Sequence, residues 1–154
     1  MMRNLELKIP PPAVALLLAI AMWLAASASG ALAFTLPGRL AIAIAAAVLG
    51  VAISVAGVVS FRRAKTTVNP TKPGTASSLV ATGIYRLTRN PMYLGLFLVL
   101  AGWAIYLSNA VAFAGPLLLV LYLNRFQIVP EERALAAKFG MSFDDYRRRT
   151  RRWI

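Results

Sequence analysis

Long apolar runs dominate the pattern of hydrophobic and polar positions along the chain. Residues 13–34 and 40–61 form two uncharged runs of 22 residues each, and a helix of that length reaches about 33 Å, enough to cross the hydrocarbon core of a bilayer. Two further runs, 91–108 and 109–126, follow one another so closely that they predict an antiparallel helical hairpin within the membrane. The pattern therefore predicts an all-α, polytopic membrane protein with about four transmembrane helices in a single membrane domain, residues 1–154.

Basic residues give this topology an orientation. All but one of the 17 Lys and Arg residues fall on the same side of the predicted bundle, the exception being Arg39. The positive-inside rule then places both termini and the loop 62–90 in the cytoplasm, and we expect a multi-pass protein of the cell inner membrane. A secretory signal peptide is the alternative interpretation of the first run, because Arg3 and Lys8 precede it.

Composition supports a lipid environment and narrows the possible chemistry. The chain is 59% hydrophobic and 14% charged, whereas soluble domains carry about 25% charged residues. Its net charge of +12 would suggest nucleic acid in a soluble protein, but beside membrane spans it suggests contact with anionic lipid, so we expect lipid partners and no nucleic acid. The absence of Cys and His excludes thiol nucleophiles, imidazole bases and Cys or His metal sites, and we expect no metal.

Small residues predict where helices approach closely. Small residues recur every four positions in the second run, at Ala46, Gly50 and Ser54, and predict a ridge against which another helix packs. The alternative is that this run is merely rich in alanine and that its small residues have no special packing role. Gly102 and Gly115 are predicted to allow close contact between the two helices of the hairpin.

Short helical patterns occur in the two polar segments. Thr82 is predicted to cap a short helix that places Tyr85 and Arg89 one turn apart on one face. Towards the C-terminus, residues 130–154 predict two cytoplasmic helices. Pro130 and two acids predict the first turn of one, which Gly140 ends, while Ser142 and Asp145 resemble a capping box for the other.

The predicted hairpin leaves and re-enters the same interface, so polar groups at its two ends should meet in a half-buried pocket. The groups concerned are Arg89, Asn90 and Tyr93 at its start and Arg125, Glu131 and Glu132 at its end.

Two motifs at these ends resemble a known family. The stretch LVATGIYRLTRNPMYLG and the later PEERALAAKFGMSFDDYRRRTRRW are similar to the isoprenylcysteine carboxyl methyltransferase family and the related phospholipid methyltransferases. The resemblance covers about residues 79–154 and implies that S-adenosylmethionine, converted to S-adenosylhomocysteine, binds on the cytoplasmic side while a lipophilic or lipid-modified acceptor enters from the bilayer. The cofactor-binding positions that it implies are Leu79, Val80, Gly83, Tyr85, Arg89, Asn90, Pro91, Tyr93, Leu94, Gly95, Glu131 and Glu132.

Charge and position at the two ends of the hairpin suggest the roles of the polar residues. Arg89, Arg125 and Glu132 are the catalytic candidates, the two arginines as a clamp for a carboxylate of the substrate or cofactor. Asn90 stands where the family usually has His. Because an amide donates hydrogen bonds but takes up no proton, this position is expected to serve binding rather than base catalysis.

Structural interpretations of the same residues stay open. Arg89 also fits the role of a cation at the membrane interface, and Tyr93 fits that of an aromatic-belt residue. The Glu131–Glu132 pair fits a helix start, where acidic side chains interact favourably with the helix dipole. The arginines of residues 147–152, with Trp153, are interpreted as an anchor to the cytoplasmic leaflet.

Other functions are also open at this level. A phospholipid N-methyltransferase and a non-catalytic membrane protein of the same fold are the main alternatives. A small transporter is disfavoured because the first three runs contain no ionisable group. Prenylated cysteine, a phospholipid amine, an isoprenoid and a small thiol all fit as the methyl acceptor.

Overall fold

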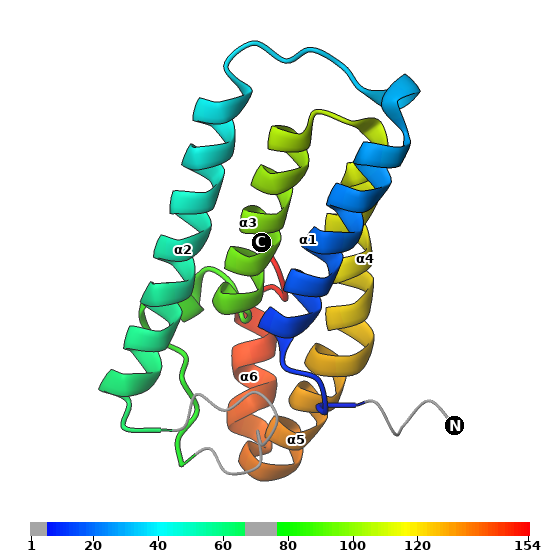
Figure 1. The fold of residues 1–154 in the computed structure, drawn as a ribbon. Helices are drawn as coiled ribbons and strands as arrows, with labels where there is room; N and C mark the ends of the chain where they lie inside the picture. The colour runs from blue at the N-terminus through cyan, green and yellow to red at the C-terminus, as the bar shows by residue number, and fades with distance from the viewer. Residues whose placement is uncertain (1–5, 67–76) are drawn as a thin grey trace.

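A bundle of long helices forms the body of the protein in the computed structural model, which describes residues 6–66 and 77–154 (Figure 1). Within these ranges the structure has no strands, and an isolated bridge joins Ala33 to Asn109. The helical elements in chain order are α1 Pro11–Ala28, η2 Gly30–Leu32, α2 Arg39–Arg63, η4 Gly83–Arg86, α3 Pro91–Leu107, η5 Ala110–Phe113, α4 Ala114–Leu123, the π-helix η6 Asn124–Ile128, α5 Val129–Phe139 and α6 Met141–Arg149.

Three helical stretches of the described chain are long and apolar enough to cross a membrane. These are α1, α2 and the run Ala110–Phe139, which joins η5 to α5 without a break, while the apolar helix α3 is shorter at 17 residues. The predicted all-α, multi-span fold is therefore confirmed. Two boundaries differ: α1 ends at Ala28 rather than near residue 34, and the last span continues through η6 into α5 instead of ending near residue 126.

Small residues bring α2 and α3 into backbone contact, as the ridge predicts. A Cβ placed on Gly50 would lie 2.5 Å from the carbonyl oxygen of Gly95, and one on Gly95 would collide with the Ser54 hydroxyl. The predicted role of the other two glycines is wrong. Gly102 faces the Ala43 carbonyl of α2, and Gly115 faces Met22 of α1, so neither glycine serves contact within the α3–α4 hairpin.

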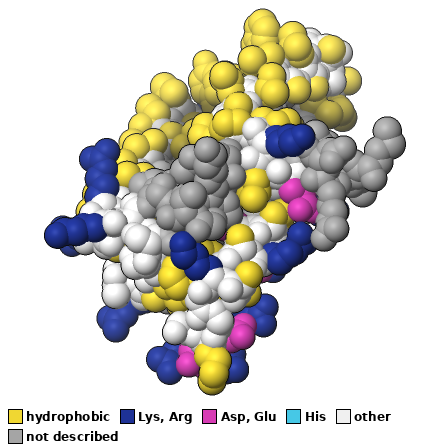
Figure 2. All heavy atoms as spheres, turned by 90° about the horizontal axis from the view of Figure 1, so that it is seen from below, with side chains coloured by type: hydrophobic (Ala, Val, Ile, Leu, Met, Phe, Trp, Pro, Cys, Tyr) yellow, Lys and Arg dark blue, Asp and Glu magenta, His cyan; other side chains and the backbone are white. Residues whose placement is uncertain are grey.

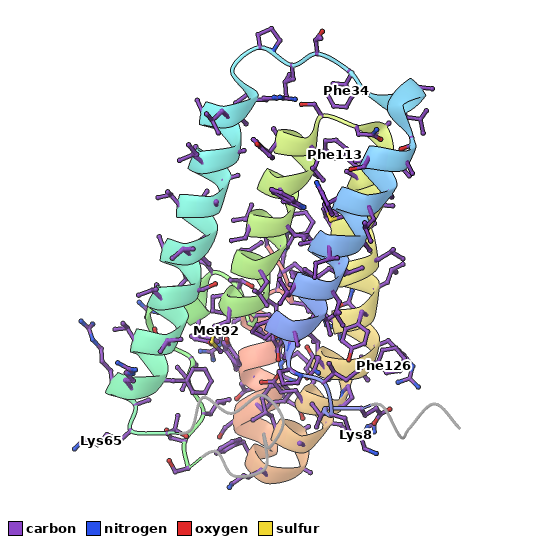
Figure 3. The ribbon with its side chains drawn as sticks, viewed as in Figure 1. Lys8, Phe34, Lys65, Met92, Phe113 and Phe126 are labelled. Atoms are coloured by element: carbon purple, nitrogen blue, oxygen red, sulfur yellow. The ribbon has the colours of Figure 1, made fainter. Side chains whose placement is uncertain are left out.

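The apolar core lies between α1, α3 and α4. Leu100, Ala104, Leu119 and Leu123 are almost wholly buried there. At the end of the bundle where Phe34 and Phe113 lie (Figure 3), the buried Asn109 donates to the carbonyl of Ser29 at 2.9 Å and so ties the end of α1 to the hairpin.

The opposite end, which we call the basic end, carries Lys and Arg side chains from several elements (Figure 2). Gly140 ends α5 with φ +50°, as predicted. Two predicted caps are wrong. Thr82 precedes η4 but makes no capping bond, and η4 ends at Arg86, so Arg89 lies outside it. Ser142 lies inside α6, whose N-cap position is taken by Gly140.

Candidate functional site

The loop that enters α3 places three motif residues at the basic end. Asn90 occupies the N-cap position of α3 and Pro91 follows at the first helical position, where its missing N–H costs nothing. Tyr93 lies within the first turn and is 6% exposed. Arg89 comes directly before this helix start, and its side chain is directed by its bonds to Thr150 and Glu132.

Glu132 of α5 is held by two arginines. Its Oε1 lies 2.7 Å from Nη2 of Arg89, and its Oε2 lies 2.6 Å from Nη2 of Arg152. Arg152 also donates from Nε to Oε1 at 3.2 Å. Two guanidinium groups on one carboxylate leave a surplus positive charge, which favours an additional anionic group nearby.

Glu131 faces the start of α3. The hydroxyl of Tyr93 donates to Oε2 of Glu131 at 3.0 Å. Adjacent acids on α5 therefore reach two different residues of the Arg89–Tyr93 stretch, and the structure brings both ends of the hairpin together as the sequence predicts.

The C-terminal segment after α6 forms another wall of the site. The backbone N–H of Arg89 donates to the carbonyl of Arg151 at 3.0 Å, and Nδ2 of Asn90 donates to the carbonyl of Arg152 at 2.8 Å. Nη1 of Arg89 also donates to the carbonyl of Thr150. The role of Asn90 in this structure is thus to bind the chain's own backbone.

Arg152 is the site residue that the sequence did not indicate. Nothing in the sequence distinguishes Arg152 from the neighbouring arginines, for all of which the pattern predicts a membrane anchor. The tertiary structure distinguishes Arg152 from its neighbours. After α6 the chain turns back towards α3, and the hydrogen bond from Asn90 holds the Arg152 backbone where its side chain reaches Glu132.

Arg125 lies elsewhere. Its Nη1 is 3.0 Å from Oε1 of Glu6, its side chain is 44% exposed, and its guanidinium lies over the ring of Phe126. The hydrogen bond from Arg125, together with the nearby charge of Arg133, holds the pKa of Glu6 below its ordinary value. The structure thus pairs Arg152, and not Arg125, with Arg89.

The remaining motif residues mainly shape the surroundings of the site. Tyr85 is 4% exposed, its ring meets Phe61 edge-on, and its carbonyl accepts a bond from the Tyr146 hydroxyl at 2.7 Å. Burial raises the pKa of both phenols. Gly83 has φ +61°, a conformation that favours glycine. The other matched positions are packing residues in this structure: the buried Val80, Pro91, Leu94 and Gly95, and the half-buried Leu79.

One buried donor in the cluster has no partner. Nε of Arg89 makes no hydrogen bond within the described residues, although the Arg89 side chain is only 10% exposed. A buried unpaired donor is costly. Together with the surplus positive charge, it suits a ligand that carries a carboxylate.

Comparison with known proteins assigns the family. The model of the phospholipid methyltransferase family matches residues 38–142, about two thirds of the chain. The chain therefore belongs to the phospholipid methyltransferase family, and the resemblance found in its motifs is confirmed. The family match includes Arg89, Glu131 and Glu132 but ends before Arg152.

Two curated relatives match parts of the chain. An uncharacterized protein of Haemophilus influenzae is 41% identical over 63 residues, which is 41% of this chain and the whole of the relative. The protein-S-isoprenylcysteine O-methyltransferase of Schizosaccharomyces pombe is 38% identical over 74 residues, 46% of this chain, and the match spans only 30% of that yeast protein. No solved structure matches the chain.

Proposed function

We propose that this protein is a membrane methyltransferase that binds S-adenosylmethionine at the basic end and methylates an acceptor dissolved in the membrane. The observation that carries the proposal is the Arg89–Glu132–Arg152 cluster, with its surplus positive charge and its unpaired Arg89 donor. Membership of the phospholipid methyltransferase family supports the same activity.

Different residues of the site would bind different groups of such a cofactor. Arg89 and Arg152 would hold its carboxylate through charge-assisted hydrogen bonds. Glu131, held by the Tyr93 hydroxyl, supplies a carboxyl oxygen that would accept a hydrogen bond from the amino group of the cofactor. The bound cofactor supplies an activated methyl group, so the protein has mainly to position the acceptor and exclude water.

An apolar groove offers a place for the acceptor. It has a volume of about 640 Å³ and is lined by apolar residues of α1, α2 and α3. At one end it reaches Leu96, which is one helical turn from Tyr93. A lipophilic acceptor with its apolar part in this groove would present its reactive group at the basic end.

Binding of the product-state cofactor tests the first half of the proposal. In calorimetric titration of the detergent-purified protein with S-adenosylhomocysteine, the wild type should bind, and Arg89→Ala and Glu132→Ala should each abolish measurable binding. Arg39→Ala is the matched control, because Arg39 begins α2 at the opposite end. No binding by a folded wild type would contradict the proposal.

Two acceptor classes are supported by different relatives. The yeast relative's name points to the carboxylate of a prenylated cysteine, and the family description points to a phospholipid amine. Membranes that contain the protein can be incubated with methyl-labelled S-adenosylmethionine and treated with base. We expect base-labile label, released as methanol, because a carboxylate nucleophile needs no general base and the chain has no His. Stable label in the phospholipid extract would identify an N-methyltransferase instead.

A further inference from the structure

The π-helix η6 lies between α4 and α5, immediately before the two site glutamates. The N–H of Val129 donates to the carbonyl of Asn124, five residues back, so the turn is wider than an α-helical turn. Pro130 has no N–H and cannot bond the carbonyl of Phe126, four residues before it. A carbonyl within a continuous helical run is therefore left without its usual helical donor.

The N-terminal segment Glu6–Ile9 supplies the missing partner. Its Leu7 N–H donates to the carbonyl of Phe126 at 3.0 Å, and Nε2 of Gln127 donates to the carbonyl of Ile9 at 2.8 Å. Figure 3 shows Lys8 and Phe126 on the same side of the basic end. Leu7 has φ +59°, a strained conformation for a leucine that persists only where the surrounding contacts hold it.

Further bonds hold the turn from both ends of the chain. Glu6 contacts Arg125 at 3.0 Å and Arg133 at 3.4 Å, and so bridges η6 to α5. On the other side, Nε1 of Trp153 donates to Oδ1 of Asn124 at 3.1 Å. Each of the four residues from Asn124 to Gln127 therefore bonds to a segment near one of the two termini.

The width of this turn determines where the site glutamates point. One residue rotates an α-helix by about 100°, so closing the π turn to an α turn would rotate Glu131 and Glu132 away from Tyr93 and Arg89. We infer that the segment Glu6–Ile9 is a strap that keeps the π turn open. The backbone N–H of Leu7 and the side chain of Gln127, a positioning residue, thereby fix the direction of the two glutamates. The existence of the strap is inferred from the geometry alone, whereas its effect on catalysis also depends on the proposed function.

A cysteine scan tests the position of the glutamates without any cofactor. Because the chain has no Cys, Glu131→Cys introduces a single thiol whose reaction rate with a water-soluble maleimide reports its surroundings. Adding Gln127→Met removes the bond to Ile9, and adding Pro130→Ala restores the helical N–H that competes with Leu7. Both additions should change the labelling rate several-fold.

Leu7→Gly is the matched control, because glycine adopts φ +59° without strain and keeps the N–H. Its labelling rate should equal that of the parent, whereas Leu7→Pro, which lacks the N–H, should behave like Gln127→Met. Folding of every variant is checked by circular dichroism and by the labelling of a denatured sample. Unchanged rates in folded Gln127→Met and Pro130→Ala would overturn the strap.

A second measurement links the strap to function. With Glu131 intact, Gln127→Met should weaken S-adenosylhomocysteine binding about tenfold while Leu7→Gly binds like the wild type. Equal binding by Gln127→Met and the wild type would overturn the positioning role. If the wild type itself fails to bind, the proposed function fails, and the thiol labelling still decides whether the strap exists.

Discussion

The side-chain amide of Asn90 donates to the backbone carbonyl of Arg152 at 2.8 Å across 62 positions of sequence. This bond closes the C-terminal segment over the start of α3. It also explains how an amide can occupy a position that the family usually gives to His, since both side chains offer an N–H donor.

Loss of the Asn90 amide should loosen the C-terminal segment. Asn90→Leu leaves the carbonyl of Arg152 without this donor, at a cost of about 1 kcal/mol, and trypsin should cleave the arginine-rich tail faster. Asn90→His keeps a donor and should be cleaved at the wild-type rate. Equal protection of the leucine and wild-type proteins would contradict the role of the amide.

Arg152 should matter for cofactor binding where its neighbour does not. Its bonds to Glu132 are charge-assisted, so Arg152→Ala should weaken S-adenosylhomocysteine binding by about 2 kcal/mol, or more than tenfold. Arg151→Ala keeps the backbone carbonyl that Arg89 uses and removes only an exposed side chain. Calorimetric titration compares the two, and similar losses in both would indicate a general effect of charge.

Close packing of α2 on α3 should make Gly95 intolerant of a methyl group. Gly95→Ala places a Cβ against the Gly50 carbonyl and the Ser54 hydroxyl, and overpacking of this kind costs about 1–3 kcal/mol. Thermal unfolding in detergent should show a lower midpoint. Gly30→Ala is the control, because a Cβ there meets nothing within 4 Å, and its midpoint should stay at the wild-type value.

Glu6 should stay ionised at a lower pH than an ordinary glutamate does. Because its folded pKa is lowered by the hydrogen bond from Arg125, the stabilisation that Glu6 gives the strap is fully present above the ordinary glutamate pKa, and is lost as pH falls through the lower folded value. Carbon-13 NMR of labelled glutamate measures this titration. In Arg125→Ala the titration midpoint of Glu6 should rise towards the ordinary glutamate value. An unchanged midpoint would show that Arg125 is not the main cause of the lowered pKa.

Orientation in the membrane is also testable. We propose that the basic end faces the cytoplasm. A membrane-impermeant maleimide applied to spheroplasts should then label Arg39→Cys but not Lys65→Cys, and both should react after permeabilisation. The reverse pattern would invert the topology.

The helices and half of the site follow from the sequence because they depend on short-range patterns. Apolar runs predict the long helices, and the hairpin brings Arg89 to Glu132. The partners of Arg125 and Asn90 could not be predicted in the same way. Each lies more than 60 positions away, at Glu6 or Arg152, in segments whose paths are fixed only by tertiary contacts.

The π turn has one sequence signal, Pro130, which taken by itself predicts a different feature. Pro130 indicates a helix start, and α5 does begin beside it. In the middle of an apolar span, however, the same proline indicates a widened turn with a free carbonyl. The partner of that carbonyl, Leu7, gives no sign in its residue type, because it uses only its backbone N–H.

The open side of the groove along α3 affects how the rate of methylation should depend on the amount of lipid. Its rim residues Leu16, Leu40 and Ile44 are more than half exposed, so in a bilayer its open side borders the acyl chains. If the acceptor binds in this groove, as proposed, lipid molecules compete with it there, and it gains access in proportion to its mole fraction among them. Adding inert lipid at a fixed amount of acceptor should therefore slow methylation, although the bulk concentration of acceptor stays the same.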